Sequence, residues 1–568
     1  MTGSRTREWR VAVVGGGIAG LAAALRLLER SRAEGRPVAV TVLEADPVPG
    51  GKVRTDRVDG LVIEQGPDSL VAQKPHGIAL ARRLGLGGEL VGPGPAARRT
   101  YVVRDGRLWP MPEGFALGVP VSAAGLWRSP LFSWRGKLRA SLEPLIPPRR
   151  DGEDESLASF LRRRLGREVA ERLAAPLLAG IASGDPEQLS VRATFPQLVR
   201  LEREYGSLVR GMRRQRRGAG TTRPGATAGE RRAAGAAAGS GVPTAQGGPE
   251  PAGRAAAARA GGLPAAAPPP GGGSGGGEGV SPAAGPAPGG PGGSGRPGDG
   301  APGGAPFVTL RGGLGRLPQA AAARIRDLGG RLVTGARVVE LAAGPAAGTY
   351  TVTLAGGQRE TFDAVVLAVP AWAAAELLEP LVPGAAAHLA AIPYKSTAVV
   401  ALAFPQEAAG PLDGSGFIVP PGEGRFLTAC TWVSAKWPGT APPGIALLRA
   451  FAGRPGEDPL ELEDAEIAGR VLADLRELAG VRGQPLHTRV YRWPRAMPQY
   501  PVGHLDRLAA LHAALQEHPR LALAGAGYRG VGVPDCIRQG EEAADRIWAA
   551  LAAGRHRSPA EEAAAARA

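Results

Sequence analysis

The chain of 568 residues is long enough for two or three domains with a large core. Its two cysteines, Cys430 and Cys536, are far apart in sequence, which argues against a disulfide framework or a structural zinc site and fits a reducing cytoplasm. The net charge of +16 comes from 68 basic and 52 acidic side chains. Because the basic residues are nearly all Arg and are scattered, a nucleic-acid interface is not favoured.

The amino-terminal residues contain no signal-peptide core, and the first apolar run is divided by glycines. We therefore expect a cytoplasmic protein without an integral membrane segment. High-GC codon usage accounts for the richness in Ala, Gly, Pro and Arg. Alternatively, the positive field draws a polyanionic small molecule toward a cleft.

The first motif, VAVVGGGIAGLAAALRLL, occupies Val11–Leu28. It predicts a buried strand, a glycine turn and a helix that begins at Ile18. In such a turn Gly15 permits a sharp bend, Gly17 allows the backbone to approach a pyrophosphate, and Gly20 allows the helix to pack closely on the strand. The motif therefore predicts a Rossmann-like dinucleotide site.

The next segments support this site. A second apolar run, Val38–Leu43, ends at Glu44, whose carboxylate is placed to accept hydrogen bonds from a ribose and would repel a 2'-phosphate, so NADP is disfavoured. A turn at Gly50 and Gly51 precedes Lys52, which brings positive charge near the cofactor phosphates.

A strand and a polar turn follow, with Gly66, Pro67, Asp68 and Ser69 in the turn and Lys74 shortly after it. Together with the glycine motif and Glu44, the segment EQGPDS resembles the flavin-containing amine oxidase superfamily. Within it, the chain is more similar to the porphyrinogen oxidases of haem synthesis, and nearer to their soluble Gram-positive members.

The segment after Asp151 predicts helices, with Ser156 as an N-cap. The string APLLAGIASGDPEQLS, residues 175–190, is the most specific part of the resemblance. The resemblance places Gly180, Ile181 and Gly184 beside a flat macrocycle, with Leu177, Leu178 and Ile181 as aliphatic walls of its cavity. Residues 218–304 contain no aromatic residue, Ile or Met, and we expect a disordered insertion there.

After the insertion we expect a helix from Arg311 to Leu328, a strand pair beginning near Val338, and a buried strand over Phe362–Pro370 that returns to the parallel sheet. The resemblance places Val338 at the adenine end of the flavin cofactor. An alternating strand, KSTAVVALAF, and an amphipathic stretch, Leu460–Ala479, indicate a second, mixed domain.

Near the carboxyl end, YRWPRAMPQYPVGH again resembles porphyrinogen oxidases, and Trp493 is expected near the flavin. His504, His512 and His518 lack metal-ligand spacing and are predicted to be surface residues. No metal site is expected.

A second G-x-G-x-x-G at Gly525, Gly527 and Gly530 permits two interpretations. It either binds a nicotinamide or, as in the resembled family, returns to the first flavin. Pro534 suits the first turn of a helix, and no further strand or ribose acid follows, so we favour the second interpretation and expect NAD(P)H not to be a substrate.

The expected fold is α/β, with a Rossmann-like FAD-binding domain assembled from discontinuous segments, a mixed α+β substrate-binding domain and a helical subdomain. The expected boundaries are 1–75, 305–375 and 491–568 for the FAD-binding parts, 76–217 and 376–490 for the substrate-binding and helical parts, and 218–304 for the insertion. Residues expected to contact non-covalent FAD are Gly15, Gly16, Gly17, Ile18, Ala19, Gly20, Glu44, Ala45, Gly51, Lys52, Gly66, Pro67, Asp68, Ser69, Val338, Trp493, Gly527, Val531, Gly532 and Val533.

The resemblance implies a six-electron oxidation of a porphyrinogen by molecular oxygen, with hydrogen peroxide released and no catalytic side chain needed beyond the flavin. It favours tetracarboxylate coproporphyrinogen III over protoporphyrinogen IX, with Lys74 as a carboxylate partner and Leu177 and Ile181 as walls. Transient contact with other enzymes of haem synthesis is also expected. An amine oxidase, a carotenoid-type desaturase and a non-enzymatic escort of the same fold are the alternatives.

Overall fold

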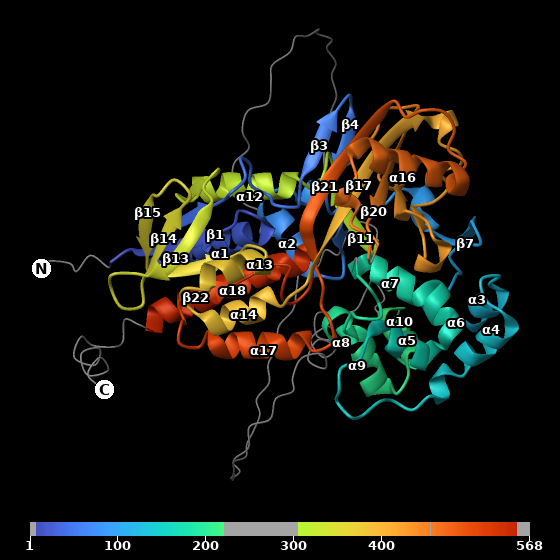
Figure 1. Cartoon of the computed structure of the whole chain (residues 1–568), viewed down its shortest axis with the longest axis horizontal. Coiled ribbons are helices and arrows are strands. Elements are labelled where there is room, and N and C mark those ends of the chain that lie inside the picture. Colours follow the sequence, from blue (N-terminus) through green and yellow to red (C-terminus); the bar gives the residue numbers. More distant parts are fainter. Residues whose placement is uncertain (1–6, 183, 221–304, 455, 554–568) are drawn as a thin grey trace, which may run out of the picture. The chain divides into compact units, whose positions relative to one another are not determined.

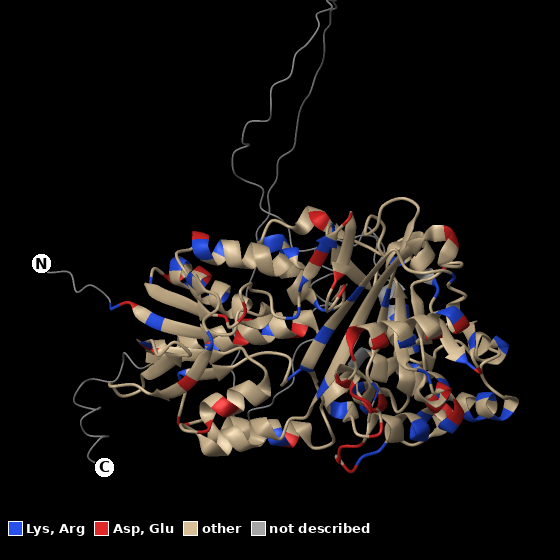
Figure 2. Ribbon diagram, turned by 45° about the horizontal axis from the view of Figure 1, so that its top comes forward, with Lys and Arg blue, Asp and Glu red and all other residues tan. Residues whose placement is uncertain are grey.

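The computed structural model describes residues 7–182, 184–220, 305–454 and 456–553 (Figure 1). Apart from the first residues of the predicted insertion, these belong to one compact unit made of residues 1–217 and 300–568. Among the described helices, none combines the length and the apolar character needed to cross a lipid bilayer. Figure 2 shows Lys and Arg distributed over every part of this unit, in line with the scattered Arg of the sequence.

A five-stranded parallel sheet has the order β12-β2-β1-β16-β22. Its strands are β1 (Trp9–Val14), β2 (Val38–Leu43), β12 (Arg331–Val333), β16 (Ala364–Leu367) and β22 (Leu521–Leu523). Apart from the edge strand β12, these are short, largely apolar runs that are mostly buried, which is the pattern of a parallel sheet. The first and second strands and the assembly of this sheet from distant parts of the chain are confirmed, although β16 is shorter than the expected Phe362–Pro370 strand.

Alternate residues of β1 enter two different cores. Val11 and Val13 pack with α1 (Ile18–Glu34), α12 (Arg316–Asp327) and α18 (Val533–Ala553). Ala12 and Val14 pack with the helices and strands of the opposite face. That face carries α13 (Ala371–Leu378), α14 (Pro383–Ala390), α17 (His504–Ala514) and the antiparallel sheet β13 (Val338–Ala343), β14 (Tyr350–Leu354) and β15 (Arg359–Phe362).

The second large sheet is mixed and has seven strands in the order β21-β17-β20-β19-β18-β7-β8. Its strands are β7 (Tyr101–Arg104), β8 (Arg107–Pro110), β17 (Tyr394–Pro405), β18 (Gly416–Ile418), β19 (Leu427–Trp432), β20 (Ile445–Ala452) and β21 (His487–Pro498), and α16 (Asp464–Ala479) covers one face. The expected boundary at residue 491 falls inside β21, because this strand pairs along most of its length with β17 rather than with the parallel sheet.

A helical region precedes the predicted insertion. It contains α3 (Ala123–Arg128), α4 (Trp134–Ser141), α5 (Leu157–Leu165), α6 (Arg167–Val169), a π-helical turn (Ala170–Ala174), α7 (Ala175–Ala182), α8 (Val191–Thr194), α9 (Pro196–Tyr205) and α10 (Leu208–Gly220). The predicted N-cap is confirmed, because Ser159 N donates to Ser156 Oγ at 3.1 Å. Helix α10 includes residues 218–220, the first three of the segment expected to be disordered, and the rest of that segment lies outside the described residues.

Shorter elements connect these parts. They are the hairpin β3 (Thr55–Val58) and β4 (Leu61–Glu64), the sheet β5 (Leu70–Val71), β11 (Phe307–Leu310) and β6 (Leu90–Val91), the pair β9 (Phe115–Ala116) and β10 (Val119–Pro120), and helices α2 (Pro75–Arg83) and α15 (Val433–Lys436). Helix α12 begins at Arg316 and not at the expected Arg311, because Gly312 and Gly313 both have positive φ and form a turn before it.

Candidate functional site

The parallel sheet has its switch point at β1, which lies between β2 and β16. Because all five strands run in the same direction, the loops that follow them meet at one edge of the sheet. That edge carries the first glycine turn after β1, Glu44 after β2, Ala368 after β16 and the second glycine motif after β22. Ligands of doubly wound sheets bind at this edge, so the arrangement indicates a nucleotide site.

Two glycines of the first turn are required by the fold itself. Gly15 has φ +101°, and a Cβ added there would lie 2.6 Å from the carbonyl oxygen of Ala368. A Cβ at Gly20 would lie 1.9 Å from the carbonyl oxygen of Gly15. The predicted roles of Gly15 in the bend and Gly20 in helix packing are confirmed.

Gly17 differs from these two glycines. Its backbone is extended, with φ −68° and ψ 173°, and the nearest atom to an added Cβ is the Cα of Gly51 at 4.0 Å. The two glycine turns are joined by a hydrogen bond from Gly50 N to Gly16 O at 2.9 Å. The protein interior therefore leaves room for a side chain at Gly17, and the bare backbone there suits a bound group.

Helix α1 begins beside this backbone. No side chain of the described residues caps its N-terminus, and its first turn contains no acid. Its N–H groups and the positive end of its dipole are free to meet an anion. The residues present therefore fit a dinucleotide pyrophosphate.

Glu44 is buried at the end of β2. Its Oε2 accepts a hydrogen bond from Gly16 N at 2.6 Å, and its Oε1 accepts one from Asp46 N at 2.8 Å. The carboxylate thus attaches the glycine turn to the end of β2, a structural role that the sequence did not indicate. Each oxygen keeps a second lone pair, and the predicted contact with a ribose stays a prediction.

Lys52 follows the Gly50 and Gly51 turn and is partly buried. Within the described chain it forms no hydrogen bond or ion pair, and burial lowers the pKa of Lys52. Removing a cation from water without a partner is unfavourable. This position therefore suits an anionic ligand.

The turn of residues 66–69 is attached to the seven-stranded sheet. Asp68 accepts hydrogen bonds from Lys436 Nζ at 2.9 Å, Trp437 Nε1 at 3.2 Å and Ser69 Oγ at 2.7 Å, and Arg449 donates to the carbonyl oxygen of Gly66. Although burial opposes it, the cations Lys436 and Arg449 hold the pKa of Asp68 well below its usual range. Asp68 therefore joins the turn of residues 66–69 to the part of the chain that carries the seven-stranded sheet. The predicted contact of this turn with a flavin stays a prediction.

Glu64, just before this turn, provides a prediction about pH. Burial raises the pKa of Glu64 to about 7, against hydrogen bonds from Leu314 N and Thr55 Oγ1 that favour the charged form. The ordinary pKa of a Glu side chain is about 4.3. Between about pH 4.3 and pH 7, Glu64 is therefore protonated more often in the folded chain than in the unfolded chain, and its contribution to the free energy of unfolding falls as the pH rises. We expect the free energy of unfolding of Glu64→Gln to rise by about 1–3 kcal/mol relative to that of the unmodified protein as the pH increases from 5 to 8.

Urea unfolding at several pH values measures this difference. The exposed residue Glu204 offers a matched control, since Glu204→Gln is expected to leave the pH dependence of unfolding unchanged. A difference between Glu64→Gln and the unmodified protein that stays constant with pH would contradict the assignment.

Two tyrosines, which the sequence did not indicate, attach the second glycine motif to the same edge of the sheet. Tyr394 Oη accepts a hydrogen bond from Ala371 N at 2.9 Å, and a Cβ at Gly527 would lie 2.8 Å from the same oxygen. Tyr500 Oη donates to the carbonyl oxygen of Ala526 and accepts from Gly530 N. No local sequence signal marks either tyrosine, because each contact joins segments distant in the chain.

Lys74 was predicted to bind a substrate carboxylate. In the structure its Nζ lies 2.5 Å from Oδ2 of Asp535, in the first turn of α18. Pro534 also lies in that first turn, as predicted. The ion pair holds α2 to the start of α18, so Lys74 already has a carboxylate partner within the chain.

His504 corrects a prediction. It was expected at the surface, but it is fully buried, its Nε2 lies 2.9 Å from the carbonyl oxygen of Tyr528, and its ring stacks on Tyr500 with centroids 4.2 Å apart. No local sequence pattern marks this burial, because the His504 ring contacts Tyr528 of the second glycine motif, which is distant in the sequence. His512 is exposed, as expected.

The remaining predicted residues occupy different surroundings. Trp493 Nε1 donates to the carbonyl oxygen of Gln65 at 2.8 Å, which places this tryptophan beside the turn of residues 66–69. Val338 is partly buried at the start of β13. Leu177 is partly exposed, whereas Leu178 lies in the core of the helical region and is not available as a wall. Ile181 belongs to α7, but its side chain lies outside the described residues.

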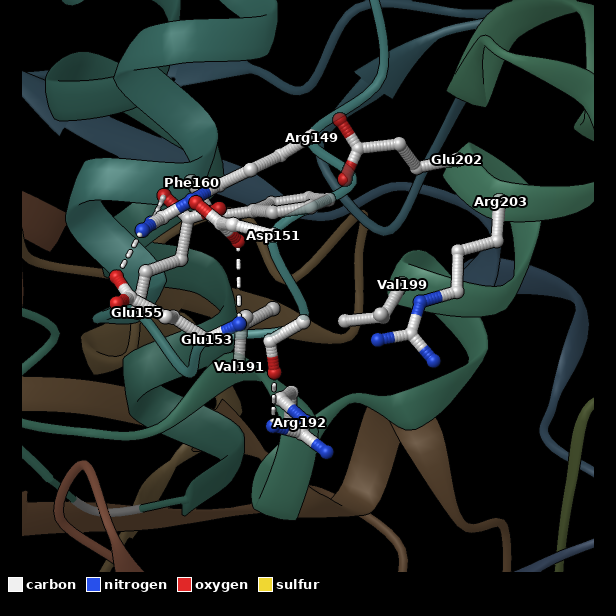
Figure 3. Close-up of a pocket in the computed structure, with 11 residues that line it drawn as sticks. Arg149, Asp151, Glu153, Glu155, Phe160, Val191, Arg192, Val199, Glu202 and Arg203 are labelled. Carbon is white, nitrogen blue, oxygen red and sulfur yellow. Dashed lines mark hydrogen bonds and ion pairs between the residues drawn. The ribbon is translucent and has the colours of Figure 1, made fainter.

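A small cavity in the helical region is separate from these residues (Figure 3). It has a volume of about 20 Å³ and is lined mostly by charged residues, among them Arg149, Asp151 and Glu202. Arg149 pairs with Asp151 at 2.5 Å, and Glu202 pairs with Arg163 at 2.6 Å. This space holds about one water molecule, so it does not accommodate a macrocycle.

A family model described as flavin containing amine oxidoreductase matches residues 18–548. The chain belongs to this family. The match begins at Ile18, the first residue of α1, and reaches into α18, so it includes Gly20 of the first glycine motif and the whole of the second. Members of the flavin containing amine oxidoreductases carry a flavin, in agreement with the nucleotide site indicated by the sheet edge.

Curated relatives of this family member are similar over nearly their whole length. The chain is 37% identical to a coproporphyrinogen III oxidase of Propionibacterium freudenreichii subsp. freudenreichii, covering 95% of this chain and 91% of that protein. It is 33% identical to a coproporphyrinogen III oxidase of Bacillus subtilis (strain 168), covering 94% and 96%. A crystal structure of a putative protoporphyrinogen oxidase from Exiguobacterium sp. 255-15 superposes with a TM-score of 0.71 at 29% identity, covering 95% and 98%.

Proposed function

We propose that the protein is an FAD-dependent coproporphyrinogen III oxidase of haem biosynthesis, which forms coproporphyrin III with molecular oxygen as the acceptor. The observation that carries this proposal is its similarity to two coproporphyrinogen III oxidases over at least 94% of its length. Protoporphyrinogen IX is the second candidate substrate, because the superposed Exiguobacterium structure is described as a putative protoporphyrinogen oxidase.

The geometry of the sheet edge supports non-covalent FAD. Gly17 and Gly51 present bare backbone, and the uncapped start of α1 offers N–H groups to a pyrophosphate. Lys52 offers a cation that has no partner among the described residues. Each carboxylate oxygen of Glu44 keeps a lone pair beyond its bond to Gly16 N or Asp46 N, which supports the predicted hydrogen bonds to a ribose.

The bound flavin supplies a hydride acceptor whose electrons pass to oxygen. The residues of this chain bind and orient the two molecules. Asp68 and Arg449 hold the turn of residues 66–69 against the seven-stranded sheet. Tyr394 and Tyr500 hold the second glycine motif at the edge of the parallel sheet. Leu177, which is partly exposed on α7, and Ile181 of the same helix are proposed walls for the macrocycle. A cytoplasmic location and transient contacts with other enzymes of haem synthesis stay predictions.

Aerobic turnover tests the proposal. We expect purified yellow protein to convert coproporphyrinogen III to a fluorescent porphyrin with release of hydrogen peroxide, at a kcat/KM about tenfold or more above that for protoporphyrinogen IX, since additional substrate carboxylates allow additional charge-assisted hydrogen bonds. Porphyrin fluorescence and peroxide assays measure both products, and an anaerobic sample serves as the control. Equal or faster oxidation of the dicarboxylate would contradict the substrate assignment, and a colourless protein that does not take up FAD would contradict the whole proposal.

A further inference from the structure

The chain contains five lysines, which differ in whether they have a partner. Three of them have partners in the described chain: Lys74 with Asp535, Lys436 with Asp68, and Lys137 with the carbonyl oxygen of Trp127. The other two, Lys52 and Lys395, are partly buried and form no hydrogen bond or ion pair with any described residue. Lys52 lies in the expected flavin segment, which leaves Lys395 unexplained.

Lys395 lies where the seven-stranded sheet meets the nucleotide edge. It is the second residue of β17, and its cross-strand partner on β21 is Met497. The preceding residue, Tyr394, bonds Ala371 N and lies against Gly527 of the second glycine motif. Lys395 therefore directly follows the residue through which the seven-stranded sheet contacts the second glycine motif.

The end of α7 approaches the same place from the helical region. A Cβ added at Gly184 would lie 2.3 Å from Oε1 of Gln499, which follows Met497 by two residues. Asp185, the next residue, is close enough to act electrostatically on Lys395. Lys395 thus lies between the second glycine motif and the helix that carries the proposed walls of the substrate site.

The charges around Lys395 do not neutralise it. Burial lowers the pKa of Lys395, and the carboxylates of Asp185 and Asp458 oppose this effect without forming an ion pair. Asp185 accepts hydrogen bonds from Glu187 N and Gln188 Nε2, and Asp458 accepts one from Leu460 N. Both acids are thus engaged in their own loops. A partly buried ammonium without a close counterion is unfavourable unless a ligand supplies one.

We propose that Lys395 binds a carboxylate of the substrate, an assignment that rests on the proposed function. The ammonium group is a compact charge with three donors and forms charge-assisted hydrogen bonds with carboxylates. It directly follows Tyr394 in β17 and lies within electrostatic reach of Asp185, which follows α7, whereas Lys74 is held by Asp535. Lys395 is accordingly a substrate-binding residue and takes no part in electron transfer.

The test compares Lys395→Met, Lys395→Arg and the control Lys137→Met in the flavin-loaded protein. Lys395→Met is expected to raise the KM for coproporphyrinogen III about tenfold or more, with kcat, flavin content and thermal midpoint nearly unchanged, because it removes one charge-assisted hydrogen bond. Lys395→Arg is expected to keep KM within about threefold, since it retains the charge. Lys137→Met is expected to change neither parameter, because Lys137 bonds only backbone in the helical region.

Equilibrium binding of coproporphyrin III, followed by fluorescence, separates this inference from the proposed function. A Kd raised about tenfold by Lys395→Met supports the assignment even if the unmodified protein fails to oxidise the porphyrinogen, which would instead count against the proposed function. An unchanged KM and Kd in Lys395→Met would overturn the assignment. Loss of flavin or of kcat at constant KM would also overturn it, because Lys395 would then act through the cofactor.

Discussion

Gly17→Val is expected to lower the flavin content of the purified protein about tenfold or more while the chain stays folded. A valine Cβ at this position meets no atom closer than the Cα of Gly51 at 4.0 Å, and the extended backbone of Gly17 is one that valine adopts readily. The side chain would instead fill the passage beside the start of α1, where we place the pyrophosphate. The ratio of flavin absorbance to protein absorbance measures the loss, and circular dichroism measures the fold.

Two further substitutions define this result. Gly422→Val is a matched control, because Gly422 is exposed and an added Cβ meets nothing within 4 Å, so flavin content is expected to be normal. Gly20→Val is expected to disrupt the fold as well as flavin binding, since its Cβ would lie 1.9 Å from the carbonyl oxygen of Gly15. Normal flavin stoichiometry in Gly17→Val would show that the nucleotide does not pass this turn.

Glu143→Ala is expected to destabilise the helical region by about 3–5 kcal/mol. Glu143 and Arg164 are both fully buried, and Arg164 Nε donates to Glu143 Oε1 at 2.9 Å. The same carboxylate accepts hydrogen bonds from Ser207 Oγ at 2.5 Å and Leu208 N at 2.9 Å. Without it, the buried guanidinium of Arg164 loses its nearer counterion and keeps only Glu202 at 3.5 Å, and the start of α10 loses its acceptor. Urea unfolding followed by circular dichroism measures the change.

An exposed ion pair gives the comparison. Glu466 and Arg470 lie one helical turn apart on α16 at 2.7 Å, and Glu466→Ala is expected to cost no more than about 0.5 kcal/mol. The double variant Glu143→Leu/Arg164→Met is expected to be more stable than Glu143→Ala, because it leaves no unpaired buried charge. A loss below about 1 kcal/mol in Glu143→Ala would contradict the importance given to this pair.

Much of the secondary structure was predictable from local sequence. The strands β1 and β2, the start of α1 at Ile18, the Ser156 cap and the position of Pro534 all follow from apolar periodicity and from residues with strong backbone or capping preferences. The glycine turns likewise carry their own geometry. The resemblance to flavin-containing oxidases led to the same family that the match over residues 18–548 identifies.

The partners of the charged and polar residues were not predictable in this way. Lys74 pairs with Asp535, Asp68 with Lys436, and the buried His504 contacts Tyr528. The first two pairs join residues hundreds of positions apart, and the third depends on how the second glycine motif folds over α17. Ion pairing and burial are properties of the assembled chain, so no local pattern reveals them.

The sequence by itself determined the glycine turns, the strands they follow and the family to which the chain belongs, because these depend on neighbouring residues. Only the tertiary structure decided that β21 joins the seven-stranded sheet, that Lys74 pairs with an internal acid and that Lys395 has no ion-pair partner in the part of the chain that the structure describes. Strand pairing and charge compensation are settled between segments that meet only after the chain has folded.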